Sequence, residues 1–196
     1  MNATLHGSVG ALVILASMAW GISSLAAPPS KTAVQHFICN AGYTPSVCKT
    51  EMDVLRKTVA RYPTAALGEW TWILIQNEDW RPILKSRGFN PNSPAFTVLG
   101  ERETFVEEAL VLRVSVRGFK LKEVWGMPMD ELLDLAVRHE MGHGLCNEKD
   151  EENASRAAAL LREGKPVSCD GNWAEATPAH DLGNRQHRRL LIGNQP

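Results

Sequence analysis

The side chains best suited to chemistry lie within five consecutive residues, His139, Glu140, Met141, Gly142 and His143. On a helix, histidines four residues apart lie on one face, one turn apart, so both imidazoles can bind one metal ion. Glu140 lies about 100° around the helix from His139, where its carboxylate can take a proton from a metal-bound water. The pattern therefore predicts a zinc site with Glu140 as the catalytic base.

The residues before this pattern favour a helix that holds its side chains. Pro128 suits a first helical turn, and the acids Asp130 and Glu131 are favourable near the positive end of the helix dipole. Apolar residues then recur at helical spacing over 132–137, and Gly144 is predicted to end the helix in a left-handed conformation. The alternative is an amphipathic core helix with two partly buried histidines and no metal.

A catalytic zinc ion takes three protein ligands and leaves one position for water. The third ligand is not a histidine six residues after His143, because Lys149 occupies that position. An alanine-rich second helix is predicted over 147–161, after a tight loop.

Helical geometry separates two adjacent acids on this second helix. Glu151 shares a face with Ala154, Ala158 and Leu161, a small apolar face that can pack on the first helix. Glu152 aligns instead with Arg156 in a solvent-facing ion pair. Glu151 is therefore favoured as the third ligand over Glu152, and further alternatives are Glu148 and Asp150.

The two elements, H-E-x-x-H at 139–143 and E-x-x-A at 151–154, resemble those of the gluzincin group of zinc metallopeptidases in a compact form. The resemblance covers about residues 129–161. It implies hydrolysis of peptide bonds in a peptide or protein substrate, with zinc bound by His139, His143 and Glu151. In this mechanism zinc lowers the pKa of its water, and Glu140 takes the proton and passes it to the leaving amine. The candidates for the oxyanion stabiliser are Tyr43, Tyr62, Arg138 and His180, and the sequence does not rank them.

The remaining patterns predict an α+β domain over 49–169, with a small sheet packed on the motif helix. The resemblance implies that this domain is zincin-like and that its sheet is mostly antiparallel. One edge strand is expected to pair with an extended peptide. The tryptophans, Trp70, Trp72 and Trp80 among them, are expected in the core rather than in a substrate groove. The predicted elements are a helix at 49–62, a strand at 70–75, a helix at 79–87 capped by Asp79 and ended at Gly88, a strand at 95–99, and at least one strand in 104–116. The candidate edge strands are 95–99 and 104–110.

The ends of the chain favour export. Residues 1–26 resemble a signal peptide with cleavage after Ala26, although an uncleaved membrane anchor is the alternative. We expect a tether over 27–48 and a flexible tail over 170–196. The four cysteines predict two local disulfides, Cys39–Cys48 and Cys146–Cys169, as suits a secreted or periplasmic protein. A cysteine zinc site is disfavoured because no C-x-x-C is present.

The bulk composition limits the partners. The net charge of −1, without a basic stripe or a glycine-rich phosphate loop, argues against a nucleic-acid partner. No stable membrane insertion is expected if the signal is cleaved, and the oligomeric state is not predicted. The leading hypothesis is an exported zinc metallopeptidase. The alternatives are a secreted zinc-binding or interaction module without turnover and a cell-wall amidase with the same zinc chemistry.

Overall fold

The computed structural model describes residues 33–112 and 115–170. Within these residues the chain forms an α+β arrangement of five α-helices, two short 3₁₀ helices and one four-stranded sheet. The predicted signal peptide, and the predicted tail apart from its first residue, lie outside the described residues. The elements in chain order are β1 (Gln35–Cys39), α1 (Pro45–Val59), η1 (Thr64–Leu67), β2 (Trp70–Ile75), α2 (Asn77–Arg87), β3 (Ala95–Val98), β4 (Glu103–Glu107), η2 (Glu108–Leu110), α3 (Val116–Trp125), α4 (Met129–Cys146) and α5 (Glu151–Arg162).

The sheet is mixed, and the prediction of a mostly antiparallel sheet was wrong. Its strand order is β1-β2-β4-β3, in which β1 and β4 both run parallel to β2, and only β3 is antiparallel, to β4. A helix lies between the strands of each parallel pair along the chain, which a parallel connection requires. The apolar run of β2 agrees with this pairing, because strands of parallel sheets are covered on both faces.

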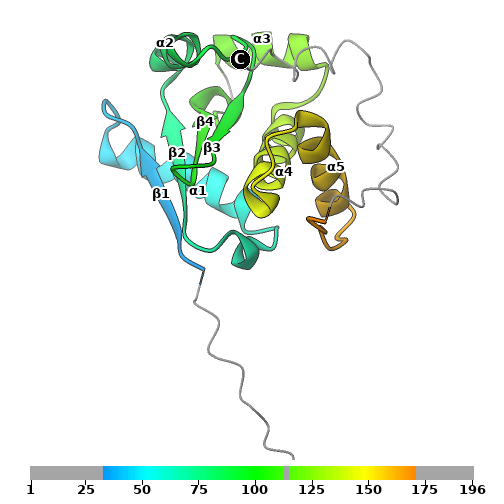
Figure 1. Cartoon of the computed structure of the whole chain (residues 1–196). Helices are drawn as coiled ribbons and strands as arrows, with labels where there is room; N and C mark the ends of the chain where they lie inside the picture. Colours follow the sequence, from blue (N-terminus) through cyan, green and yellow to red (C-terminus); the bar gives the residue numbers. More distant parts are fainter. Residues whose placement is uncertain (1–32, 113–114, 171–196) are drawn as a thin grey trace, which may run out of the picture. The chain divides into compact units, whose positions relative to one another are not determined.

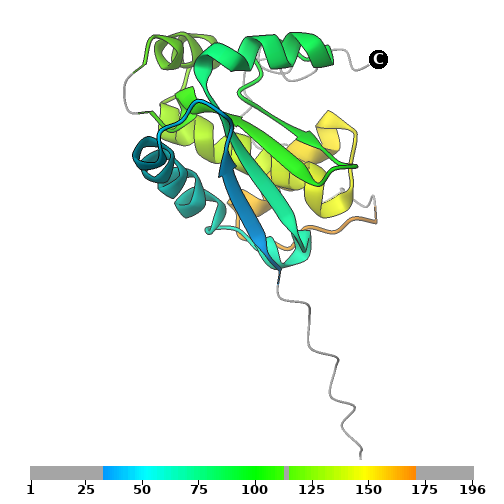
Figure 2. The same ribbon diagram turned by 90° about the vertical axis from the view of Figure 1, so that its left-hand side faces the viewer.

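Helices cover both faces of the sheet, and α4 is one of them. On one face lie α1 and α4 (Figure 2). Their buried residues form the larger core together with Trp72 and Leu74 of β2. On the other face, Trp80 and Leu84 of α2 pack against β2, β3 and β4. Helix α5 lies beside α4 (Figure 1). The expectation that the tryptophans are core residues is confirmed for Trp70, Trp72 and Trp80, which are all buried.

The segment predicted as a tether, 27–48, contains regular structure. Strand β1 occupies Gln35–Cys39, and α1 begins at Pro45 rather than at residue 49. Gly42, one of the turn residues behind the tether prediction, lies in the short connection between these two elements. Gly42 has a φ of 103°, and Pro45 stands in the first turn of α1, where its missing N–H costs no helical hydrogen bond.

The segment 104–116 is only partly a strand. Strand β4 ends at Glu107, a 3₁₀ turn follows, and α3 begins at Val116. The sequence did not predict α3 because Val116 and Phe119 are exposed on it, at 76% and 64%, so its apolar residues do not form one buried stripe. The Ser115 hydroxyl caps its N-terminus by accepting a hydrogen bond from the Gly118 amide.

The motif helix continues past its predicted end. Gly144 lies inside α4, and the left-handed residue is Asn147, with a φ of 48°. Gly144 serves close packing, since a Cβ there would lie 2.8 Å from Leu67 Cδ2 and 2.9 Å from the Trp70 ring. Helix α2 begins two residues before its predicted cap, and Asp79 accepts a hydrogen bond from Asn40 instead. The predicted end of α2 at Gly88 is confirmed, with a φ of 73°.

Both predicted disulfides are present. Cys39–Cys48 joins β1 to α1, and Cys146–Cys169 joins the end of α4 to the segment after α5. The pairings are compatible with an oxidising compartment. Each helix in the described part of the chain is too short or too polar to cross a membrane.

Candidate metal centre

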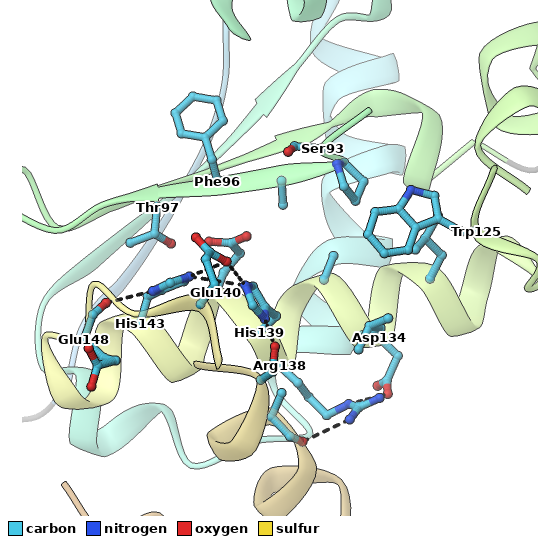
Figure 3. Close-up of a pocket in the computed structure, with 18 of the residues that line it drawn as sticks. Ser93, Phe96, Thr97, Trp125, Asp134, Arg138, His139, Glu140, His143 and Glu148 are labelled. Carbon is cyan, nitrogen blue, oxygen red and sulfur yellow. Dashed lines mark hydrogen bonds and ion pairs between the residues drawn. The ribbon is translucent and has the colours of Figure 1, made fainter. Parts of the chain in front are cut away.

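The two motif histidines and Glu151 converge on one point. Glu151 Oε2 lies 2.9 Å from His139 Nε2 and 3.5 Å from His143 Nε2, and the two Nε2 atoms are 3.2 Å apart. Figure 3 shows the His139 and His143 rings side by side, with the Glu140 carboxylate next to them. Within the described residues this is the only group of three or more His, Cys, Asp or Glu side chains that could hold a metal ion.

Hydrogen bonds on the outer side of each ring turn the Nε2 atoms inward. His143 Nδ1 lies 2.7 Å from the backbone carbonyl oxygen of Glu148, which can only accept, so Nδ1 carries the proton. His139 Nδ1 lies 3.3 Å from the Ser155 hydroxyl. The Ser155 hydroxyl can accept from His139 Nδ1 in the same way. In that arrangement, neutral imidazoles direct two lone pairs toward each other and toward a carboxylate. Three electron donors this close require a cation or protons between them.

The acid–base properties of the centre also favour positive charge. Burial lowers the pKa of His143, but the hydrogen bond with Glu151 and the charges of Glu140 and Glu151 outweigh burial and raise it to about 9. Burial raises the pKa of Glu151, but its hydrogen bonds to His139 and His143 outweigh burial and lower it to about 2. A bound cation could replace the proton that these groups share.

Glu140 lies beside the three donors and is not one of them. Its side chain is buried, and its Oε2 atom has no hydrogen-bond partner among the described residues. Burial raises the pKa of this carboxyl group above its ordinary value, although the two histidines and a hydrogen bond with Thr97 oppose that rise. A buried carboxylate with a free oxygen beside a cation site is suited to accept a proton from a bound molecule.

Close contact between α4 and α5 brings Glu151 to the histidines. A Cβ on Gly142 would lie 2.5 Å from the Ala154 carbonyl oxygen, so only glycine allows this approach. The Asp150 side chain starts α5 by accepting from the Asn153 amide. Arg138 joins the two helices further along, since its guanidinium donates to the Ala158 carbonyl at 3.0 Å. The sequence placed Ala154, Ala158 and Leu161 on the face of α5 that packs on α4, and all three are buried.

The centre opens into a cleft of about 1210 Å³ between α4 and the sheet edge. Residues 93–100, which include strand β3, line one side of this cleft, and α4 and α5 line the other. Because β3 ends the sheet, the edge strand near the centre is 95–98, the first of the two predicted candidates. Trp125 closes one end of the cleft (Figure 3).

The alternative third ligands have other roles. Glu152 pairs with Arg156 at 2.7 Å on the surface of α5, as predicted. The Glu148 carboxylate accepts from the Asp150 and Asn153 nitrogens, and Asp150 is the cap of α5. Of the four acids considered, the structure therefore brings only Glu151 to the histidines.

The residues named as oxyanion stabilisers do not point a free donor into the cleft. Tyr62 donates to Asp134, and Arg138 pairs with the same carboxylate at 2.9 Å. Tyr43 is half-buried among carboxylates at Glu51 and Glu108 and does not line the cleft. His180 lies outside the described residues.

The sequence analysis did not identify two polar residues at the centre. Ser155, which contacts His139, lies four residues after Glu151 on the same face of α5, so helical spacing could have identified it. Thr97, which contacts Glu140, comes from a strand more than 40 residues earlier in the chain. No pattern in the sequence gives the strand pairing that places it there.

Comparison with models of known protein families, with curated proteins and with solved structures found no match to this chain.

Proposed function

We propose that this protein is an exported, zinc-dependent hydrolase of peptide bonds with a compact gluzincin-like active site in a zincin-like domain. The observation that carries the proposal is the convergence of His139 Nε2, His143 Nε2 and Glu151 Oε2 beside the buried carboxylate of Glu140. The disulfides support an extracellular or periplasmic location, because such bonds persist in oxidising compartments.

The spacing of the donors fits zinc. Ligands at about 2.0–2.1 Å in a tetrahedral arrangement are separated from one another by about 3.3 Å. The three separations here are 2.9, 3.2 and 3.5 Å. Two imidazoles and one carboxylate are also a donor set that catalytic zinc sites use, with the fourth position left for water.

The protein side chains have distinct tasks in this proposal. His139, His143 and Glu151 would hold zinc. When bound, zinc would act as a Lewis acid that makes the attacking water more acidic and polarises the peptide carbonyl. Glu140 accepts the proton of that water and returns it to the leaving amine, and its raised pKa suits both transfers. Ser155 and the Glu148 carbonyl keep the imidazoles oriented.

The sheet edge supports an extended peptide as the substrate. Strand β3 pairs with β4 on one side only, and its other side borders the cleft. A peptide laid along β3 could add its backbone hydrogen bonds to the sheet, as in other cases of strand addition. This placement would bring a peptide carbonyl near Glu140 and the three metal-binding side chains.

The test compares cleavage of casein and of a peptide library by the zinc-loaded wild type, Glu140→Gln and Glu152→Gln, with zinc content measured in each. We expect Glu140→Gln to bind zinc normally and to lose at least about 100-fold in rate, because the base is removed and the ligands are kept. Glu152→Gln is the control for loss of a carboxylate, since Glu152 lies on α5 and its half-exposed carboxylate pairs with Arg156, and this variant should retain full activity.

Three results would change the assignment. Equal zinc binding with no cleavage by any variant would favour a binding module. Cleavage of cell-wall crosslinks but not of peptides, lost in Glu140→Gln, would favour an amidase. Full activity of Glu140→Gln would refute the proposed role of this residue.

A further inference from the structure

A chain of hydrogen bonds leads from the core of the sheet to Glu140. Thr97 of β3 stands opposite Thr104 of β4, and their hydroxyl oxygens are 2.9 Å apart. The Trp70 indole N–H, on β2, donates to Thr104 Oγ1 at 3.0 Å. At the other end, the Thr97 side chain is one of the groups that oppose the rise in the pKa of the Glu140 carboxyl group, through hydrogen bonding. Figure 3 shows Thr97 pointing from its strand toward Glu140.

The chemistry of the donors fixes the direction of this chain. An indole N–H can only donate, so Thr104 Oγ1 accepts from Trp70. Thr104 is fully buried, and the acceptor beside its own proton is Thr97 Oγ1. If Thr97 donated to Thr104 instead, the Thr104 proton would be buried without a partner, which is costly. Thr97 therefore accepts from Thr104, and its own proton is directed at Glu140.

We propose that Thr97 is a positioning residue for Glu140, and that Trp70 and Thr104 orient its hydroxyl so that it donates to the carboxylate. This inference rests on the proposed function, in which Glu140 moves the proton of the attacking water. The bond from Thr97 occupies one acceptor site of the carboxylate and restricts its rotation. The Oε2 atom, which has no partner, is then left to meet the water.

The chain also couples the two sides of the cleft. Thr97 belongs to β3, the strand whose free edge borders the cleft, and Glu140 belongs to α4. The strand proposed to align the substrate thus also aligns the base. Because Thr97 acts through Glu140 and is not a metal-binding residue, its loss should affect the turnover number and leave zinc binding intact.

The experiment measures kcat and KM for peptide cleavage by the zinc-loaded full chain, together with zinc content and Tm. Thr97→Val replaces the hydroxyl with a methyl group of similar size, and Thr97→Ser keeps the hydroxyl. We expect Thr97→Val to lower kcat by at least about tenfold, with KM within about twofold and zinc content unchanged, because only orientation of the base is lost. Thr97→Ser should restore kcat to within about threefold of the wild type.

A second pair of variants tests the direction of the chain. Thr104→Val removes the donor to Thr97, so we expect a smaller loss of kcat than in Thr97→Val. The double variant Thr97→Val/Thr104→Val should have the kcat of Thr97→Val alone, because Thr104 acts only through Thr97. Purely additive losses would contradict the chain.

The outcomes separate this inference from the proposed function. A wild type that cleaves peptides, with a Thr97→Val variant of equal kcat, overturns the positioning role alone. A Thr97→Ser variant as impaired as Thr97→Val overturns it as well, since packing and not the hydroxyl would then matter. A zinc-loaded wild type that cleaves nothing overturns the proposed function and this inference together.

Discussion

Gly142 offers a sharp test of how the second helix delivers Glu151 to the metal centre. Replacing it with alanine places a Cβ 2.5 Å from the Ala154 carbonyl oxygen and 3.1 Å from Ala157 Cβ. Ordinary contact begins at 3.4 Å, so α5 must retreat by about 0.9 Å, the difference between 3.4 and 2.5 Å. Because Glu151 is on α5, its carboxylate moves away from the histidines.

The magnitudes follow from packing and ligand geometry. Overpacking costs about 1–3 kcal/mol, and alanine in a helix regains about 1 kcal/mol over glycine, so Gly142→Ala should lose about 0–2 kcal/mol in the free energy of unfolding. The displacement of one ligand should weaken zinc binding by about 10–100-fold, the range seen when groups that orient ligands are disturbed.

Gly144→Ala is the matched control. It adds the same methyl group to the same helix and also crowds its neighbours, but these are the side chains of Leu67 and Trp70 rather than α5. Zinc affinity would be measured by competition with a chromophoric chelator, and stability by urea unfolding of the metal-free protein. Gly144→Ala should lose comparable stability and keep its affinity. A folded Gly142→Ala protein with the affinity of the wild type, or a similar loss of affinity in both variants, would refute the reasoning.

Two further predictions concern stability. Burial and the neighbouring Glu108 raise the pKa of Glu51 to about 7 from an unfolded value near 4.5, so the native state holds a proton that the unfolded state releases. Its contribution to stability is therefore complete below about pH 4.5 and is lost as the pH rises through 7, by on the order of 2–3 kcal/mol. Urea unfolding should show that the free energy of unfolding of Glu51→Gln rises relative to that of the wild type between pH 5 and 8. Parallel pH profiles of the two proteins would contradict the raised pKa of Glu51. Replacing both cysteines of Cys146–Cys169 by serine should cost about 3.4 kcal/mol, from the loop entropy for a sequence separation of 23, and should weaken zinc binding, because this bridge ties the end of α4 to the segment after α5. The same change at Cys39–Cys48 should cost about 2.5 kcal/mol, from the loop entropy for a sequence separation of 9, and should leave zinc affinity unchanged. An equal loss of zinc affinity on removal of either bridge would contradict this prediction.

The sequence predicted that His139, His143 and Glu151 come together because these residues are related by local helical geometry. His139 and His143 are one turn apart, and Glu151 was separated from Glu152 by the small apolar face it shares with Ala154. The disulfides followed from the preference for local loops. These inferences needed only spacing along the chain.

Features that depend on contacts between distant segments were not predictable in this way. The parallel pairing of β1 with β2 joins residues 35 positions apart, and no turn motif in the sequence predicts this pairing. The contact of Thr97 with Glu140 depends on that sheet and on how α4 packs against it. Glycine is common at helix ends, and Gly144 was therefore predicted to end the helix. Its close contacts with Leu67 and Trp70, which the sequence does not reveal, explain why glycine stands there inside α4.

The central claim is that two imidazoles and one carboxylate bind zinc together. Zinc X-ray absorption spectroscopy on the zinc-loaded, oxidised full chain tests it most directly, because it reports the atoms bound to the metal. We predict one zinc ion per chain, nitrogen and oxygen neighbours at about 2.0–2.1 Å, and scattering from two imidazole rings. Glu151→Gln should weaken the binding and change the oxygen contribution. A sulfur neighbour at about 2.3 Å, a single imidazole, or no bound zinc would contradict the account.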